Sequence, residues 1–171
     1  PGTFDPVTNG HLEIIRRAIR IFGLKVYVGI GVNPEKECLF TLQERKQILQ
    51  DALTASRLNR KVNVDYYEDF TKRYADKVGD TFLLDGIRDE NDLESKINQA
   101  YNNYSINGIE TLFIFTAKEY KHISSTRVRE LAKSGAWEKL NKLVLPNVIA
   151  ALKSKHTKNV DGSGVTSSGT A

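Results

Sequence analysis

The chain has 171 residues, the length of one domain or of one domain with a short tail. Hydrophobic residues make up 40% of it and charged residues 27%, which is ordinary for a folded protein and too apolar for a disordered one. No apolar run approaches the roughly 20 residues that cross a bilayer, and the first residues lack the basic start and apolar core of a signal peptide. We therefore expect a protein without a membrane partner.

The charge and the cysteine content exclude further classes of protein. The net charge is +4, and the basic residues are scattered except for small clusters at 118–129 and 153–158. Because a nucleic-acid-binding protein usually carries a concentrated basic stripe, we expect no nucleic-acid partner. Cys38 is the only cysteine, so the chain cannot form an internal disulfide, and a reducing, cytoplasmic location fits it best. The three histidines lack the spacing of a zinc site.

Short apolar runs rich in β-branched and aromatic residues alternate with amphipathic patterns along the chain. In chain order we predict a helix over 11–22, a strand over 25–32, a helix that begins with a capping box at 41–44, a strand over 62–67, a helix over 69–78, a strand over 81–84, a helix over 89–106, a strand over 110–115, and a helix that starts at Ser124 or Ser125 and ends at residue 133. Short segments over 137–144 and 147–154, separated by Pro146, follow.

This alternation predicts an α/β fold, a Rossmann-like doubly wound parallel sheet with right-handed crossovers. The strand that feeds the first helix is usually central in such a sheet, yet the numbered chain opens on a turn. We therefore expect that the first strand is missing from the numbered chain. Residues 1–158 should form the domain, and the Gly-, Ser- and Thr-rich residues 159–171 should form a flexible tail or linker.

The first eleven residues have the features of a phosphate-binding turn. Gly2 and Gly10 allow the backbone to approach a ligand closely, and the N–H groups at the start of the following helix suit an anion. His11 stands in the first turn of that helix, where its ring can donate to a phosphate oxygen, and Thr3 adds a hydroxyl.

This segment resembles the signature of the nucleotidyltransferase superfamily, a G-T-F-D-P sequence followed by a T/H-x-G-H tetrad that opens a helix. The T-N-G-H form at 8–11 is typical of bacterial phosphopantetheine adenylyltransferases. The resemblance extends roughly over residues 1–155 and includes N-P-E-K at 33–36, G-I-R at 86–88, a D-x-E…A-x-x-N pattern at 92–103, K-E-Y at 118–120 and I-S-S-T at 123–126. It implies the fold of that superfamily, cytoplasmic location, and transfer of AMP from Mg-ATP to 4′-phosphopantetheine, giving dephospho-CoA and pyrophosphate. It also implies a homo-oligomer, commonly a hexamer.

The resemblance further implies roles for individual residues. His11 would stabilise the α-phosphate, Lys36 would neutralise and orient the acceptor phosphate, and Arg88 would bind the ATP phosphates. The residues expected to bind ATP are Thr3, Phe4, Gly10, His11, Gly86, Arg88, Tyr120, Ser124, Ser125 and Thr126. Those expected to bind the acceptor are Thr3, Lys36, Phe70, Thr71 and Asn103. Mg²⁺ would be held largely by ATP oxygens and water, without protein ligands.

The chain departs from the family pattern near these residues. Asp85 stands where the family usually has arginine, Lys96 where it has a second glutamate, and Asn98 where it has glutamine. An anion in place of a phosphate-facing cation exchanges attraction for repulsion, which is worth about a few kcal/mol at short range. Lys96 could restore part of the lost positive charge.

Two other readings remain open at this point. The I-S-S-T-x-x-R sequence at 123–129 resembles that of nicotinate-mononucleotide adenylyltransferases, although Thr8 and Asn9 replace the Ile-His usual there and no Gly-x-Asp motif follows the strand at 110–115. A noncatalytic nucleotide- or CoA-binding homologue would also explain Asp85, the absent first strand and the Ser/Gly-rich tail. Nucleic-acid binding through 118–129 fits less well, because no aromatic platform is interleaved with the basic residues.

Overall fold

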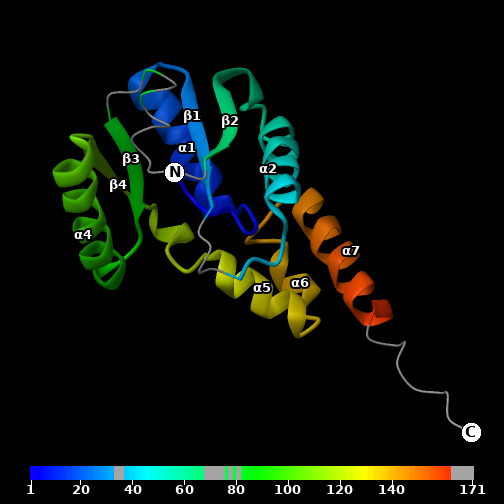
Figure 1. Ribbon diagram of the computed structural model, residues 1–171. Coiled ribbons are helices and arrows are strands. Elements are labelled where there is room, and N and C mark those ends of the chain that lie inside the picture. The colour runs from blue at the N-terminus through cyan, green and yellow to red at the C-terminus, as the bar shows by residue number, and fades with distance from the viewer. Residues whose placement is uncertain (33–36, 68–75, 77–78, 80–81, 163–171) are drawn as a thin grey trace, which may run out of the picture.

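The computed structural model describes residues 1–32, 37–67, 76, 79 and 82–162 of the chain. Figure 1 shows its elements, which in chain order are α1 (Asn9–Phe22), β1 (Val26–Gly31), α2 (Leu42–Ala55), the 3₁₀ helix η1 (Asn59–Lys61), β2 (Val62–Tyr67), β3 (Phe82–Ile87), α4 (Glu90–Asn107), β4 (Glu110–Phe115), the 3₁₀ helix η2 (Lys118–Tyr120), α5 (Ser125–Lys133), α6 (Trp137–Leu140) and α7 (Pro146–Gly162). The helix predicted over 69–78 lies mostly outside the described residues.

The described strands form two parallel pairs. β1 pairs with β2, with Val26 opposite Val62, and β3 pairs with β4, with Phe82 opposite Glu110. Helix α1 contacts both β1 and β3 and so joins the two pairs. Parallel strands with helical connections confirm the predicted α/β fold.

A doubly wound sheet has its central strand between the positions of β1 and β3. Among the described residues, no strand lies between β1 and β3. The opening residues of the chain pair with β1 on the side that faces β3. Gly2 forms a parallel bridge with Ile30, in which Gly2 N donates to Gly29 O at 3.0 Å and Gly31 N donates to Gly2 O at 2.9 Å.

Local sequence signals set the helix ends. Thr8 caps α1, which ends at Gly23 in the left-handed conformation with φ 65°. The predicted capping box of α2 is present, since Glu44 N donates to Thr41 Oγ1 at 3.2 Å and Thr41 N donates to Glu44 Oε2 at 2.7 Å. Asp89 caps α4 through a bond from the backbone of residue 92. The starts predicted for α2 and α4 agree with these caps to within one residue, whereas α1 begins at Asn9, two residues before its predicted start, because Thr8 is its cap.

Two elements are longer than predicted. β3 runs to Ile87 instead of residue 84, because residues 85–87 keep the parallel register with residues 113–115 of β4. α7 begins at Pro146, where the missing N–H costs nothing, and runs to Gly162 instead of residue 154. No glycine or proline interrupts 147–161, so the helix enters the segment that was predicted as a tail. Residues 163–171 lie outside the description.

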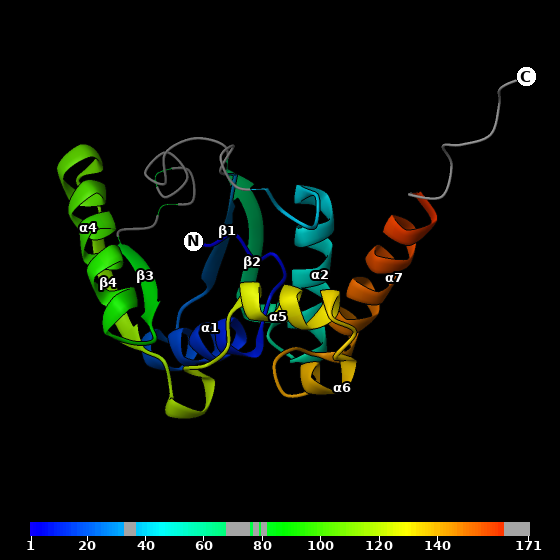
Figure 2. The same cartoon turned by 90° about the horizontal axis from the view of Figure 1, so that it is seen from below.

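The main hydrophobic core lies on the β1–β2 side of the molecule. Its fully buried side chains come from the opening loop, β1, α2, α5, α6, α7 and the segment between α6 and α7, and include Val7, Ile30, Leu49, Leu53, Val128, Leu140, Val144, Val148 and Leu152. Each such side chain stabilises the fold by about 1.5–3 kcal/mol. Leu83 of β3 and Ile109, which stands just before β4, form a smaller cluster. Figure 2 shows α4, β3 and β4 on one side of the molecule and α2 and α7 on the other, with α1 and α5 between them.

Candidate active site

A cavity of about 800 Å³ lies between the two strand pairs. Its apolar end is lined by side chains of α1, β1 and β3, including Phe22, Val28 and Leu84. Its polar end is formed by the opening loop, the start of α1, the end of β3, the start of α4, and the start of α5. Ligands of parallel α/β sheets bind beyond the carboxyl ends of the strands, so the polar end is the candidate site.

The cavity brings together every residue that the sequence predicted to bind ATP. Its lining includes Thr3, Phe4, Gly10, His11, Gly86, Arg88, Tyr120, Ser124, Ser125 and Thr126. These residues come from five separate stretches of the chain, between positions 3 and 126. The structure supports their grouping in one site, and their individual roles stay predictions.

His11 is held by the residue that caps its own helix. The backbone N–H of Thr8 donates to His11 Nδ1 at 3.0 Å, and His11 N donates to Thr8 Oγ1 at 3.4 Å. Because Nδ1 accepts a bond, the proton of the neutral ring lies on Nε2. The ring packs at a tilt against Phe4, with 4.9 Å between the ring centroids. The capping box therefore sets both the orientation and the tautomer of His11, and leaves Nε2–H as its donor.

The surroundings of His11 keep its ring uncharged. Burial, and after it the positive charges of Arg88 and Lys96, lower the pKa of His11 to about 4. At neutral pH the ring is thus an N–H donor and not a cation. Such a donor can stabilise charge that develops on a phosphate oxygen without giving up its proton.

Arg88 follows β3 directly and is fixed by Asp92 in the first turn of α4. Its Nε donates to Asp92 Oδ2 at 3.3 Å, its Nη2 to Asp92 Oδ1 at 3.0 Å, and its backbone N–H to Asp92 Oδ2 at 3.1 Å. Burial opposes the shift, but the hydrogen bonds from Arg88 outweigh it and lower the pKa of Asp92. The Arg88 side chain is 38% exposed, so other N–H groups of its fork can bind an anion.

The start of α5 closes the opposite wall of the polar end. Ser124 is its N-cap, and the Ser124 hydroxyl accepts from Arg127 N at 3.1 Å. Ser125 Oγ donates to Pro6 O at 2.8 Å and ties α5 to the opening loop. The first N–H groups of a helix have no intrahelical acceptor and carry a partial positive charge. The backbone of this turn therefore offers an anion site, while the two serine hydroxyls hold the turn in place.

Gly86 and Gly10 both line the cavity, but the lack of a side chain serves a different purpose at each position. A Cβ on Gly86 would lie 3.0 Å from Ile14 Cγ1, so glycine there lets β3 and α1 approach each other. A Cβ on Gly10 would meet Thr8 Oγ1 at 3.6 Å and Tyr120 Cβ at 3.9 Å, which are ordinary contacts. The protein itself leaves room for a side chain at Gly10, and the absence of one keeps the cavity wall open beside His11.

Asp5 and Arg129 are two residues of this site that sequence reasoning did not select. Asp5 is 2% exposed, and its carboxylate accepts from Leu39 N and Phe40 N, both at 2.9 Å. Arg129 of α5 donates to the backbone oxygen of Asp5 and pairs with its carboxylate at 3.4 Å. The signal was present in part, since Arg129 stands four residues after Ser125 and so on the same face of α5.

Two of the residues that depart from the expected pattern, Asp85 and Lys96, contact each other. Lys96 Nζ of α4 lies 2.5 Å from Asp85 Oδ1 of β3, and both residues line the cavity. Asn98, the third departure, is exposed on α4.

Some predicted site residues cannot be placed at the cavity. Lys36, Phe70 and Thr71 lie outside the described residues. Asn103 is on α4, about 10 Å along the axis from Lys96 at about 1.5 Å per residue. It is absent from the described residues that line the cavity.

Three aspartates of the polar end are paired with cations, while Glu37, which also lines the cavity, is exposed. Asp5 pairs with Arg129, Asp92 with Arg88, and Asp85 with Lys96. Within the described ranges, His, Cys, Asp and Glu side chains form no group of three or more that could hold a metal ion. The polar end thus offers cations and N–H donors, which is the chemistry of a phosphate site. In the same part of the chain, no helix has the length and hydropathy needed to span a membrane.

Comparison with known proteins gives consistent matches. Residues 1–131 match the profile of a family described as cytidylyltransferase-like. The chain is 44% identical over 135 residues to the phosphopantetheine adenylyltransferase of Lactococcus lactis subsp. cremoris, covering 78% of this chain and 81% of the relative. It is 37% identical over 150 residues to the enzyme of that name from Chromobacterium violaceum, with 86% and 89% covered. It is 40% identical over 156 residues to the one from Chloroflexus aurantiacus, with 91% and 93% covered.

Proposed function

The chain belongs to the cytidylyltransferase-like family, and we propose that it transfers the adenylyl group of ATP to 4′-phosphopantetheine, giving dephospho-CoA and pyrophosphate. The observation that carries the proposal is the polar end of the cavity, where His11, Arg88 and the first turn of α5 line one space. The relatives support the choice of acceptor, because they are named phosphopantetheine adenylyltransferases and this chain matches them over most of their length.

In the proposed reaction an oxygen of the acceptor phosphate attacks the α-phosphorus of ATP. The new P–O bond forms while the bond to the β-phosphate oxygen breaks, and its electron pair leaves with pyrophosphate. Such a transfer depends on in-line placement and on neutralising charge, and it requires no nucleophilic side chain. A site that offers fixed cations and N–H donors is suited to this task.

His11 would donate from Nε2–H to an α-phosphate oxygen as charge develops there. Arg88 and the first backbone N–H groups of α5 would bind the β- and γ-phosphates, with the Arg88 fork suited to two oxygens. Tyr120, next to Gly10, would flank the adenine. We assign Lys36, Phe70, Thr71 and Asn103, together with Thr3, to the acceptor on the resemblance alone.

We propose that Mg²⁺ enters with the nucleotide. Asp5, Asp85 and Asp92 at the polar end are each paired with arginine or lysine, which fits an ion that is coordinated by phosphate oxygens and water. When bound, the ion would neutralise part of the triphosphate charge. The protein's own contribution is to orient the phosphates through Arg88 and the start of α5.

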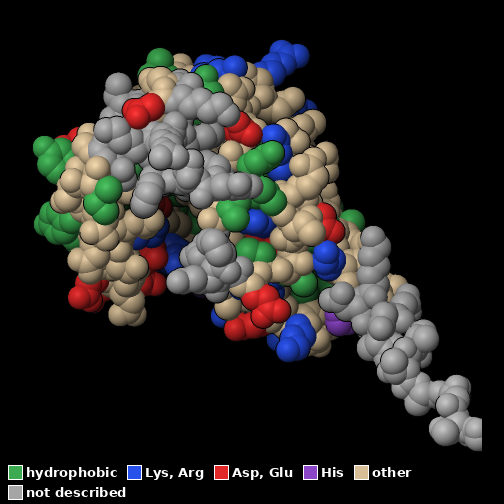
Figure 3. All heavy atoms as spheres, in the orientation of Figure 1, with side chains coloured by type: hydrophobic (Ala, Val, Ile, Leu, Met, Phe, Trp, Pro, Cys, Tyr) green, Lys and Arg blue, Asp and Glu red, His purple; other side chains and the backbone are tan. Residues whose placement is uncertain are grey.

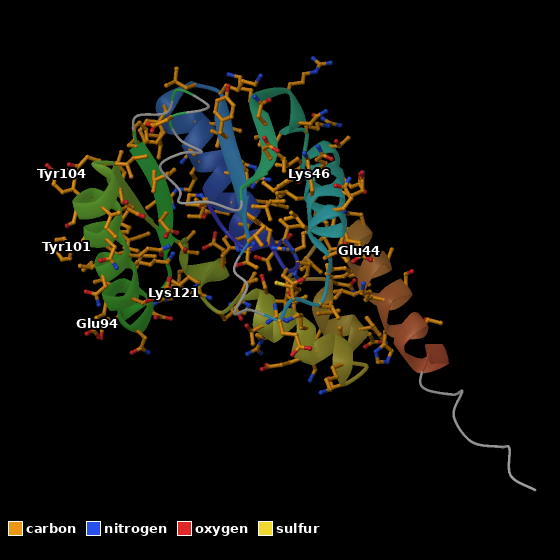
Figure 4. All side chains as sticks on the ribbon, viewed as in Figure 1. Glu44, Lys46, Glu94, Tyr101, Tyr104 and Lys121 are labelled. Atoms are coloured by element: carbon orange, nitrogen blue, oxygen red, sulfur yellow. The ribbon has the colours of Figure 1, made fainter. Side chains whose placement is uncertain are left out.

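We further propose that the protein is a homo-oligomer, a hexamer as the resemblance implies, and that it acts in the cytoplasm. Exposed large apolar side chains lie on α4 and β4, among them Tyr101, Tyr104, Ile106 and Phe115. Figure 3 shows hydrophobic side chains on the outer side of α4, and Figure 4 shows Tyr101 and Tyr104 pointing away from the body of the molecule. Light scattering after size exclusion should give a mass of several chains, reduced in the Tyr101→Asp variant. A monomer at micromolar concentration would contradict the proposal.

The activity is tested by pyrophosphate release from Mg-ATP with two rival acceptors, 4′-phosphopantetheine and nicotinate mononucleotide. The second acceptor is included because Arg129, the last residue of the motif shared with nicotinate-mononucleotide adenylyltransferases, lines the cavity. Release with 4′-phosphopantetheine alone is expected. Release with the mononucleotide alone would transfer the proposal to that reaction. No release with either acceptor, alongside measurable ATP binding, would indicate a noncatalytic nucleotide-binding protein.

A further inference from the structure

The ion pair between Asp85 and Lys96 is built into the wall of the candidate site. Their side chains are only 24% and 19% exposed, and Asp85 Oδ1 also accepts from Gly86 N at 2.8 Å. The carboxylate is thereby anchored to the strand backbone. It holds the Lys96 ammonium, at the end of a flexible side chain, in one place.

Lys96 of α4 and Arg88, which precedes α4, both line the cavity. Lys96 stands four residues after Asp92, so both side chains lie on one face of α4. The pairs Arg88–Asp92 and Asp85–Lys96 therefore lie next to each other along the junction of β3 and α4. In Figure 3, acidic and basic side chains meet in the hollow beside α4. His11 lines the same cavity as Lys96 and Arg88.

We propose that Lys96 is a nucleotide-phosphate-binding residue of this site and that Asp85 is the positioning residue that holds its ammonium there. An ammonium has three N–H donors, and its pair with one carboxylate oxygen leaves others for a phosphate oxygen. Asp85 without Lys96 would present an uncompensated negative charge to the triphosphate. The ion pair cancels the negative charge of Asp85 at the cavity wall, so that wall keeps an ammonium group for a phosphate.

The inference rests on the proposed function in one respect, namely that the ligand is a nucleotide triphosphate. It is tested by direct ATP binding, measured by titration calorimetry without any acceptor. Turnover with 4′-phosphopantetheine tests the proposed function separately. A wild-type protein that binds ATP but does not use this acceptor would refute the reaction and leave the test of Lys96 intact.

The test compares Lys96→Met with a matched control. We expect K96M to weaken ATP binding about tenfold or more, because it removes a charge-assisted contact and leaves Asp85 unpaired. The control is Lys155→Met, since Lys155 forms an ion pair with Glu44 at 2.9 Å, is similarly covered at 23% exposure, and joins α7 to α2; neither residue is among the described residues that line the cavity. Glu44 is labelled in Figure 4. K155M should bind ATP as the wild type does. Equal ATP affinity of K96M and the wild type would overturn the proposal.

The role of Asp85 is tested by whether a second substitution, Asp85→Asn, strengthens or weakens ATP binding. In the K96M background, Asp85→Asn removes the unpaired anion, so D85N/K96M should bind ATP more tightly than K96M, yet at least about threefold more weakly than the wild type. A merely structural ion pair would not move ATP affinity in this direction. The double variant also has no buried unpaired charge, so it keeps the test readable where K96M fails to fold. In the wild-type background, D85N releases the Lys96 ammonium, so it should raise KM for ATP more than it lowers kcat. Wild-type affinity in D85N/K96M would contradict the inference.

Discussion

The backbone N–H of Thr8 and the Nδ1 atom of His11 lie 3.0 Å apart, within a capping box at the start of α1. A contact that ends a helix here also prepares a side chain for chemistry, because it commits one ring nitrogen and leaves the other free to donate. The same helix start contributes Gly10, which opens the cavity wall beside that ring. Local helix-forming signals and the proposed phosphate site are therefore encoded by the same few residues.

His11→Ala should lower turnover about 10²–10³-fold, the effect of removing one preorganised donor to developing charge. Loss of the capping contact should destabilise the fold by only about 1 kcal/mol. Pyrophosphate release and thermal unfolding would be measured together. His122→Ala is the control, because His122 is exposed and is not among the described residues that line the cavity. Turnover within a few-fold of the wild type would exclude His11 from the chemistry.

The lowered pKa of His11 predicts a pH dependence of stability with a definite sign. Unfolding restores the ordinary pKa of 6.5, so between pH 6.5 and about 4 the unfolded chain binds the extra proton. The contribution is complete above pH 6.5 and is lost as the pH falls toward 4, with a size of about 2 kcal/mol for a partly covered ring. Urea denaturation from pH 7 to 4.5 should show this loss in the wild type and a flatter profile in His11→Asn. Equal profiles would count against the buried neutral ring.

Substitutions of Arg88 and Asp92 should show whether ATP binding depends on the planar geometry of the Arg88 guanidinium as well as on its charge. Arg88→Lys keeps the positive charge but loses the planar fork, and Asp92→Asn keeps the shape but loosens that fork. Each should raise KM for ATP by about tenfold, at about 1.4 kcal/mol, with little change in thermal stability. Arg127→Lys serves as the control, because the exposed side chain of Arg127 stands outside the residues described at the cavity. Unchanged KM in both variants would show that Arg88 forms only a structural ion pair.

Much of the fold could be predicted because its signals are local. The strand at 62–67 and the capping box at 41–44 depend on neighbouring residues and agree with the structure. β3 was predicted too short because its last three residues include Asp85 and Gly86, which have low strand propensity and are kept in the strand by pairing with β4.

Only the site residues that stand in recognisable motifs could be predicted from the sequence. The residues assigned to ATP stand in recognisable motifs, and they meet at one cavity. Asp5 and Arg129 are 124 positions apart, and no local pattern links them. Asp85 and Lys96 were visible as departures from a pattern. Their ion pair, however, depends on how α4 packs on β3, and the periodicity of the sequence does not specify that packing.

Glycine substitutions should separate packing from ligand approach. Gly86→Ala would place a Cβ 3.0 Å from Ile14 Cγ1 and 3.1 Å from Ile14 Cδ1, so it should destabilise the fold by about 1–3 kcal/mol. Ile14→Val in the same chain should recover part of that loss. Gly10→Ala meets only ordinary contacts in the protein and should keep or raise the melting temperature while it weakens ATP binding. A Gly10→Ala protein with wild-type ATP affinity would show that no ligand approaches there.

Charge reversal at the β3–α4 junction should show strong coupling in stability. Asp85→Arg sets a guanidinium against the Lys96 ammonium, both largely covered, and should cost about 1–3 kcal/mol in the free energy of unfolding. Adding Lys96→Glu restores opposite signs across the same junction and should recover most of that loss. Lys96→Glu alone should be destabilising as well, because it opposes two carboxylates. Urea denaturation of the four proteins gives the coupling energy directly. Additive effects of the two substitutions would mean that Asp85 and Lys96 do not interact in solution, and the positioning role argued for Asp85 would fall with them.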